Sequence, residues 1–135
     1  MDILSASAGD DKVAWYENNG SESFTEHVIT TSADYVRSVY AVDVDADGDI
    51  DVLSADHNGG DIIWYKNNGS QSFTASTIRD KSYGANSVYA ADVDSDGDMD
   101  VLGAYHGGDI EWYENNGSES FTARSVFSAG YNNST

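Results

Sequence analysis

Two nearly identical acidic stretches carry the residues of this sequence that are best suited to chemistry. Residues 43–51 read Asp-Val-Asp-Ala-Asp-Gly-Asp-Ile-Asp, and residues 92–100 read Asp-Val-Asp-Ser-Asp-Gly-Asp-Met-Asp. In an extended chain, carboxylates on alternate residues line one face and repel each other. A hard cation converts that repulsion into coordination, and Asp-x-Asp-x-Asp-Gly is a pattern that supplies oxygen ligands to calcium. Two matching copies favour a pair of Ca²⁺ loops over a solvated acidic turn.

Each acidic loop offers four alternate side chains and one main-chain carbonyl as calcium ligands. In the first loop the expected side-chain ligands are Asp43, Asp45, Asp47 and Asp51, with the carbonyl of Asp49. In the second loop they are Asp92, Asp94, Asp96 and Asp100, with the carbonyl of Asp98.

The composition limits the partners that this chain can have. The 135 residues contain 24 acidic and 6 basic residues, for a formal charge of −18. So acidic a surface repels nucleic acid and anionic membranes, and no apolar run is long enough to insert into a membrane. The absence of cysteine excludes disulfides and zinc-thiolate sites. No signal peptide precedes the first expected strand, so an export signal is expected to have been removed or to lie outside this sequence.

An internal repeat organises the rest of the chain. Trp-Tyr pairs recur at Trp15, Trp64 and Trp112, at spacings of 49 and 48 residues, and each pair leads into Asn-Asn-Gly-Ser. Asn-Gly between alternating segments indicates a β-hairpin, because both residues tolerate positive φ. The two aromatic side chains of each pair are expected to point to opposite faces of a sheet and fill the layers between sheets. A sugar-stacking role for Trp64 and Trp112 is the alternative.

The pattern of short alternating segments predicts an all-β fold without helices. Strands are expected at residues 2–6, 13–17, 24–30, 38–44, 51–55, 61–66, 73–79, 87–93, 100–105, 109–114 and 121–127. Four antiparallel strands in about 48 residues is typical of a β-propeller blade. The predicted blades cover residues 1–32, 38–80 and 87–128, and the first lacks its inner strand and acidic loop.

At this point the sequence resembles a known family. Val-Asp-x-Asp-Gly-Asp-x-Asp-Val-Leu, followed by Trp-Tyr-x-Asn-Asn-Gly-Ser-x-Ser-Phe-Thr, is similar to the FG-GAP/VCBS repeat over essentially the whole chain. The resemblance implies calcium-loaded propellers, as in integrin α-chain heads and in fungal and bacterial lectins. The family's Gly-Ala-Pro segment is replaced by Ser-Ala-Ser, Ser-Ala-Asp and Gly-Ala-Tyr, which places the chain nearer to the bacterial VCBS type.

Fewer than three complete blades do not close a ring, because known propellers use about four or more. Two apolar faces and long strand edges would remain exposed. We therefore expect identical chains to join head to tail as a cyclic dimer or trimer. The alternative is that the sequence is a fragment of a longer propeller.

The loops on the face opposite the acidic loops differ between copies, so they are candidates for ligand binding. Aromatic, amide, acidic and imidazole groups suit a neutral polyhydroxylated ligand. The candidates are Tyr35, Arg37, Asp56, His57, Asn58, Tyr83, Tyr105 and His106, together with Trp64 and Trp112. His57 and His106 are also open to roles as metal ligands, general bases or ordinary solvated side chains.

These features predict an extracellular or cell-surface, calcium-stabilised binding module that is lectin-like and recognises glycans. The alternative is a structural calcium-dependent scaffold that assembles with itself and has no ligand of its own. We expect no enzymatic activity, because the sequence offers no recognisable nucleophile–base arrangement or nucleotide loop.

Overall fold

The computed structural model describes residues 1–82 and 84–130, and in these residues eleven strands and no helix are present. The strands are β1 (Ile3–Ser7), β2 (Lys12–Asn18), β3 (Phe24–Thr30), β4 (Val36–Val42), β5 (Asp51–Asp56), β6 (Asp61–Asn67), β7 (Phe73–Asp80), β8 (Ala85–Ala91), β9 (Asp100–Tyr105), β10 (Ile110–Asn115) and β11 (Phe121–Phe127). Within this described part, no helix long and apolar enough to cross a membrane is found.

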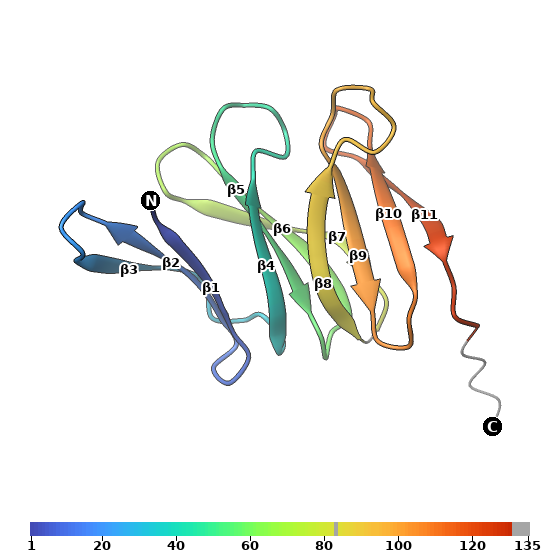
Figure 1. The fold of residues 1–135 in the computed structure, drawn as a ribbon, viewed down its shortest axis with the longest axis horizontal. Coiled ribbons are helices and arrows are strands. Elements are labelled where there is room, and N and C mark those ends of the chain that lie inside the picture. The colour runs from blue at the N-terminus through green and yellow to red at the C-terminus, as the bar shows by residue number, and fades with distance from the viewer. Residues whose placement is uncertain (83, 131–135) are drawn as a thin grey trace.

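The strands form three antiparallel sheets in which consecutive strands pair. The first blade contains β1–β3, the second β4–β7 and the third β8–β11. Figure 1 shows the three blades side by side, with the first and the third at the ends of the row. The predicted all-β architecture of propeller blades is therefore confirmed, including the three-stranded first blade.

The three blades pack face to face through two clusters of buried side chains. One cluster joins the first and second blades and includes Val13, Val52 and Tyr65. The other joins the second and third blades and includes Trp64 and Val101. Tyr65 and its neighbour Trp64 thus serve opposite faces of the second blade, as the period of two along a strand dictates. The packing role expected for these aromatic residues is confirmed at this pair.

The strands before the acidic loops end earlier than the sequence predicts. β4 ends at Val42 and β8 at Ala91, each two residues before the expected end. The next residue, Asp43 or Asp92, turns its carboxylate back into the loop. Asp43 Oδ2 accepts a hydrogen bond from Gly48 N at 2.9 Å, and Asp92 Oδ2 accepts one from Gly97 N at 3.1 Å. These local bonds compete with strand pairing.

The Asn-Asn-Gly-Ser hairpins form as predicted, but the expected turn conformation is wrong. In the first blade Asn19 N donates to Ser23 O at 3.0 Å, which closes a five-residue turn. Positive φ occurs at Gly20 and Glu22 rather than at asparagine. Asn19 instead uses its side chain, whose Oδ1 accepts a hydrogen bond from Ser21 N at 2.8 Å. Side-chain capping of the turn thus replaces the left-handed asparagine of a two-residue turn.

Candidate functional site

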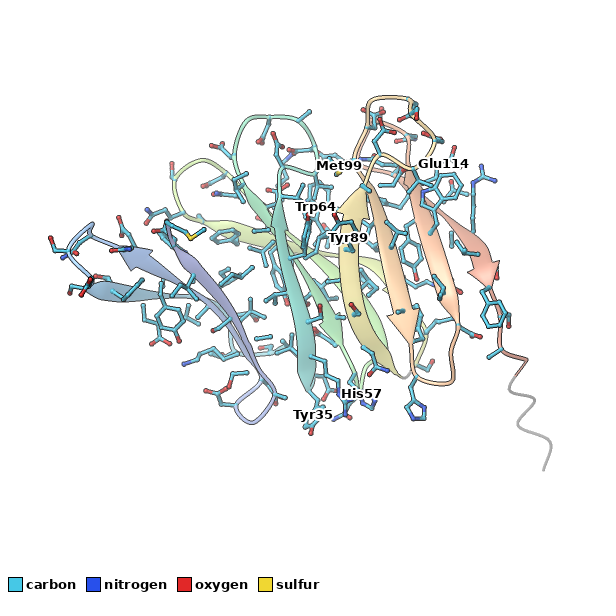
Figure 2. All side chains as sticks on the ribbon, viewed as in Figure 1. Tyr35, His57, Trp64, Tyr89, Met99 and Glu114 are labelled. Atoms are coloured by element: carbon cyan, nitrogen blue, oxygen red, sulfur yellow. The ribbon has the colours of Figure 1, made fainter. Side chains whose placement is uncertain are left out.

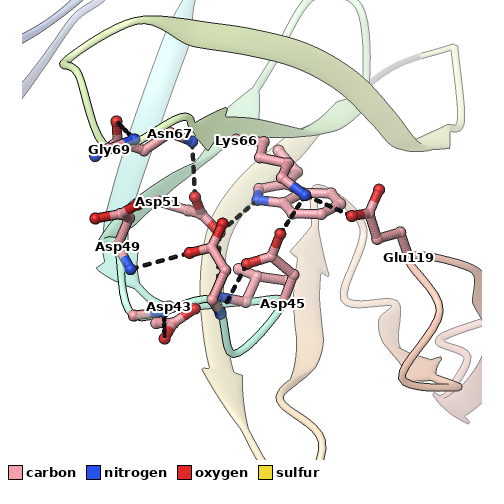
Figure 3. Close-up of polar contacts among 12 residues, drawn as sticks. Asp43, Asp45, Asp49, Asp51, Lys66, Asn67, Gly69 and Glu119 are labelled. Carbon is pink, nitrogen blue, oxygen red and sulfur yellow. Dashed lines mark hydrogen bonds and ion pairs between the residues drawn. The ribbon is translucent and has the colours of Figure 1, made fainter.

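The first acidic loop, between β4 and β5, brings three carboxylates together. One oxygen each of Asp43, Asp45 and Asp51 lies within 4.8 Å of the others. Figure 3 shows these side chains converging from the two ends of the loop. Positive φ at Ala46 and Gly48 lets the backbone curl around the cluster. The three carboxylate oxygens thus form part of a coordination shell that suits a hard cation.

The second acidic loop, between β8 and β9, repeats the arrangement. Asp92, Asp94 and Asp100 bring one oxygen each within the same 4.8 Å limit. Ser95 and Gly97 adopt the positive φ values seen in the first loop. Asp92 and Asp94 are exposed here, whereas their counterparts in the first loop are half-buried. The two clusters therefore share geometry but differ in their access to solvent.

The donor set fits calcium. Asp43 Oδ1 is buried and has no hydrogen-bond partner among the described residues, so a strong acceptor faces the first cluster unpaired. Such an atom is costly unless a cation or a donor satisfies it. Carboxylate oxygens arranged on a flexible loop are the ligands that calcium prefers. The residues present are therefore compatible with the ion that the sequence implies.

Asp51 is the fully buried member of the first cluster. Its oxygens accept hydrogen bonds from Asn67 N at 2.8 Å, Trp64 Nε1 at 2.9 Å and Val44 N at 3.1 Å. Burial raises the pKa of Asp51 from its usual 3.8, although these three hydrogen bonds oppose the rise. A carboxylate offers about four lone-pair sites, so one remains for an ion. Asp51 thus joins the loop to the β6 strand behind it.

Not every predicted ligand belongs to the clusters. Asp47 and Asp96 are absent from them, and the Oδ1 atom of each accepts the N–H two residues later at 2.9 Å. The side chains of Asp49 and Asp98 lie against the hairpin turns, because a Cβ built on Gly69 or Gly117 would lie 2.5 Å from their Oδ2 atoms. This position leaves only the main-chain carbonyls of Asp49 and Asp98 as candidate ligands.

One residue at the first cluster was not identified from the sequence. Lys66 Nζ lies 2.5 Å from Asp45 Oδ2 and 2.5 Å from Glu119 Oε1 in the hairpin of the third blade. Figure 3 shows this lysine between the two carboxylates. Its hydrogen bonds to Asp45 and Glu119 raise the pKa of Lys66 above its usual value. The available signal is that glutamate occupies the matching position in the other repeats, at Glu17 and Glu114.

The opposite face carries an aromatic and cationic cluster built from two blades, which we call the histidine cluster: Tyr35, Arg37, His57 and His106. The rings of His57 and His106 are 6.1 Å apart and meet edge to face, and Tyr35 lies 5.9 Å from His57. The Arg37 guanidinium stands 5.3 Å above the Tyr35 ring. Figure 2 labels Tyr35 and His57 at the edge away from the acidic loops. The structure therefore joins four predicted ligand-binding residues.

Backbone hydrogen bonds hold the two histidines in place. Gly84 N donates to His57 O, and His106 N donates to Gly84 O, each at 2.6 Å. His57 Nδ1 is buried without a hydrogen-bond partner among residues 1–82 and 84–130. Asn58 lies beside this cluster and donates to Asp34 Oδ1 at 3.2 Å. The cluster thus combines a backbone held by hydrogen bonds with an exposed tyrosine and histidine, Tyr35 and His106, at the protein surface.

Other predicted ligand-binding residues lie elsewhere. Asp56 is buried and accepts a hydrogen bond from Ser54 Oγ at 2.7 Å, and burial raises its pKa. Tyr105 is also buried, and burial raises its pKa to about 12. Tyr83 lies outside the described residues. These positions of Asp56 and Tyr105 favour structural roles over direct contact with a ligand.

The two tryptophans differ in what surrounds them. Trp64 is only 3% exposed, and the edge of Phe121 packs on it at 6.1 Å, so its ring offers little surface for stacking. It borders a cleft of about 340 Å³ between the acidic loops. Trp112 is half-buried, and the Arg124 guanidinium lies 5.5 Å from its ring. Neither tryptophan lies in the histidine cluster.

A partly buried ionic network between the second and third blades was also not identified from the sequence. Glu111 receives hydrogen bonds from Arg79 Nε at 3.1 Å and Tyr113 Oη at 2.7 Å, and Lys81 Nζ lies 2.9 Å away. Burial opposes ionisation, but these hydrogen bonds and charges lower the pKa of Glu111 below its usual 4.5. The signal is a glutamate where the other repeats have Ala14 and Ile63.

The fold and the acidic loops define the class of protein as a segment of a repeat-built β-propeller. The chain belongs to the FG-GAP-like repeat family, whose model matches residues 1–54, 43–103 and 92–135. No curated protein matches the chain.

A solved structure shares the fold. It is that of an Agrocybe aegerita lectin described as specifically recognising non-reducing terminal N-acetylglucosamine, with a TM-score of 0.58 and 20% identity. The match covers 94% of this chain but only 38% of the lectin chain.

Proposed function

We propose that this chain is a calcium-stabilised propeller module that binds carbohydrate through the histidine cluster. The observation that carries the proposal is the convergence of Tyr35, Arg37, His57 and His106 from two blades at the loop face. Aromatic rings stack on the apolar face of a sugar, while imidazole, guanidinium and amide groups bond its hydroxyls. The fold shared with a lectin that recognises N-acetylglucosamine supports the same class of ligand.

Calcium has a structural part in this proposal. Asp43, Asp45 and Asp51 would hold one ion, and Asp92, Asp94 and Asp100 another, with main-chain carbonyls completing each site. The ions would neutralise carboxylates that otherwise repel each other next to the inner strands. Calcium supplies charge neutralisation and rigidity here, and the glycan-binding residues lie on the opposite face. The role is thus binding rather than catalysis.

The proposed location is extracellular or at a cell surface. Calcium-binding modules outside cells have Kd values of about 10⁻⁴–10⁻³ M, so their sites fill only where calcium is millimolar. The strongly acidic composition, −18 at neutral pH, is compatible with such a setting.

A glycan array tests the function, with N-acetylglucosamine-terminated glycans as the first probes. The calcium-loaded chain is expected to bind, and His57→Ala and His106→Ala to abolish the signal. His27→Ala is the matched control, because His27 pairs with Glu17 on the first blade, away from the cluster. Silence of the wild-type chain across diverse glycans would reject the carbohydrate proposal. Equal binding by all variants would reject the assignment of the site.

The second candidate is a calcium-dependent scaffold that assembles with itself. The exposed apolar residues on the first and third blades favour it, for example Ile3 at 52% exposed and Phe127 at 57%. Assembly and glycan binding are compatible, because weak sites repeated around a ring gain avidity.

A further inference from the structure

The two junctions between blades inside the chain follow one pattern. The face that each blade turns toward the following blade is here its forward face, and the other is its backward face. Val13 and Ile62 occupy the same forward position, each paired with the one alanine of its neighbouring strand, and both are 0% exposed. Val52 and Val101 occupy the same backward position, each paired with the tyrosine of a Trp-Tyr unit, and are 4% and 0% exposed.

The forward face of the third blade keeps this apolar pattern with nothing covering it among the described residues. Ile110 takes the position of Val13 and Ile62 but is 39% exposed. Val126 takes the position of Ile29 and Ile78, which pack into the internal junctions, yet it is 60% exposed. Phe127 beside it is 57% exposed.

The backward face of the first blade is the counterpart. Ile3 takes the position of Val52 and Val101, paired with Tyr16, but is 52% exposed. Phe24 takes the position of Phe73 and Phe121, paired with the asparagine that follows the Trp-Tyr unit, and is 45% exposed. Apolar side chains are thus retained at both ends of the row, where exposure to water is unfavourable.

An aromatic contact shows how the two end faces match. At the junction between the second and third blades, Phe121 packs its edge against Trp64. The corresponding tryptophan of the third blade, Trp112, has no phenylalanine packed on it in the described structure, and Phe24 has no tryptophan ahead of it. A following copy placed as the third blade follows the second would bring Phe24 to Trp112.

The two end faces also lack the charged pair that joins the second and third blades. Arg79 and Glu111 form an ion pair across the junction between the second and third blades. One junction further on, the position of Arg79 is Phe127, paired with Ile110 as Arg79 is with Ile62. The position of Glu111 on the first blade is Ala14, paired with Ser5 as Glu111 is with Gly103. Both positions of the ion pair thus carry apolar residues on the end faces, so joining these faces would not leave one member of the pair buried without the other.

We propose that the forward face of the third blade binds the backward face of the first blade of a second copy of this chain. The contact repeats the packing between the second and third blades, with Phe24 of one copy against Trp112 of the other. A head-to-tail contact closes into a ring when its rotation returns to the first copy, and we expect a ring of two or three copies. The junction is independent of glycan binding, which uses the loop face.

The mass of the particle in solution tests the proposal directly. In calcium buffer, light scattering of the wild-type chain is expected to give two or three times 14.5 kDa. Ile3→Glu and Phe127→Glu, which each place a charge in the junction, are expected to give monomers with an unchanged circular dichroism spectrum. Ser70→Glu is the control, because it adds the same charge at an exposed hairpin of the middle blade.

Mixing the two variants separates a head-to-tail junction from a symmetric one. Ile3→Glu keeps an intact forward face and Phe127→Glu an intact backward face, so together they form one good junction and a 1:1 complex by native mass spectrometry. A monomeric wild-type chain, an open series of growing particles, or no complex on mixing would overturn the proposal. Monomers of Ile3→Glu that still bind glycans would leave the proposed function standing separately.

Discussion

Lys66 provides the sharpest test of the first acidic loop, because it competes for a proposed calcium ligand. Its Nζ atom lies 2.5 Å from Asp45 Oδ2, the atom pair marked in Figure 3. The second loop has Glu114 at the matching position, and Glu114 pairs with Arg124 instead of with a carboxylate of the loop. We predict that Lys66→Gln tightens calcium binding at the first loop and leaves the second loop unchanged.

The size of the effect follows from distance and exposure. Calcium–oxygen bonds are about 2.4 Å long, so an ion sharing the Asp45 carboxylate with Lys66 would lie within about 5 Å of the ammonium group. The Lys66 side chain is 33% exposed, so water screens much of the repulsion between the single and double positive charges. Coulomb repulsion at that distance with water-like screening corresponds to about a tenfold change in affinity.

Isothermal titration calorimetry of wild type and Lys66→Gln measures both sites in one experiment. Lys12→Gln is the matched control, because it removes the same charge from the first blade, where Lys12 pairs with Glu26 at 2.7 Å. Unchanged or weaker binding in Lys66→Gln would refute the competition. Equal tightening by Lys12→Gln would assign the effect to net charge instead.

Three further predictions concern stability. With calcium at ten times its Kd, two filled loops should add about 3 kcal/mol to the free energy of unfolding, so a chelator should lower Tm by about 10 °C. Asp45→Ala and Asp94→Ala should each reproduce part of this loss in calorimetry. Glu111→Gln should cost about 2 kcal/mol at pH 7 in urea unfolding. Since the pKa of Glu111 is lowered in the folded state, the stability difference between wild type and Glu111→Gln is fully present above pH 4.5. The difference should shrink as the pH falls below 4.5. Gly69→Ala should destabilise more than Gly20→Ala, because the added Cβ meets Asp49 only at Gly69; equal losses would contradict this.

The contact of Lys66 with Asp45 leads us to expect that the two acidic loops differ in how much they depend on a cation. In the first loop Lys66 joins Asp45 to Glu119 of the next blade, so part of the loop is tied to its neighbour without any ion. In the second loop the loss of some surrounding water, together with nearby carboxylates including Glu114, raises the pKa of Asp94, although its side chain is exposed. We therefore expect the second loop to depend more on a bound cation and to fill first in the titration.

Much of the fold was predictable because its signals are local. The Trp-Tyr spacing, the alternating strands and the Asn-Gly hairpins each depend on residues close in sequence, and all three were confirmed in kind. The errors were local too: β4 ended at Val42 because the Asp43 side chain competes for backbone N–H groups.

The candidate sites were predictable only in part. The order of the aspartates predicted a cluster, but Asp47 turned its side chain to its own loop instead of the cluster. The ion pairs of Lys66 and Glu111 were not predictable, because their partners, Glu119 and Arg79, are far away in the sequence and meet them only across blades.

The sequence by itself determined the repeating sheets and the two acidic loops, since period-two alternation and glycine-centred turns act within a few residues. The tertiary structure decided which loop receives a lysine, that Tyr35, His57 and His106 meet, and that Ile3 and Phe127 stay exposed. The physical reason is that equivalent positions carry the same local preferences in every repeat. Only the packing of one blade on the next shows which of those positions find a partner and which face solvent.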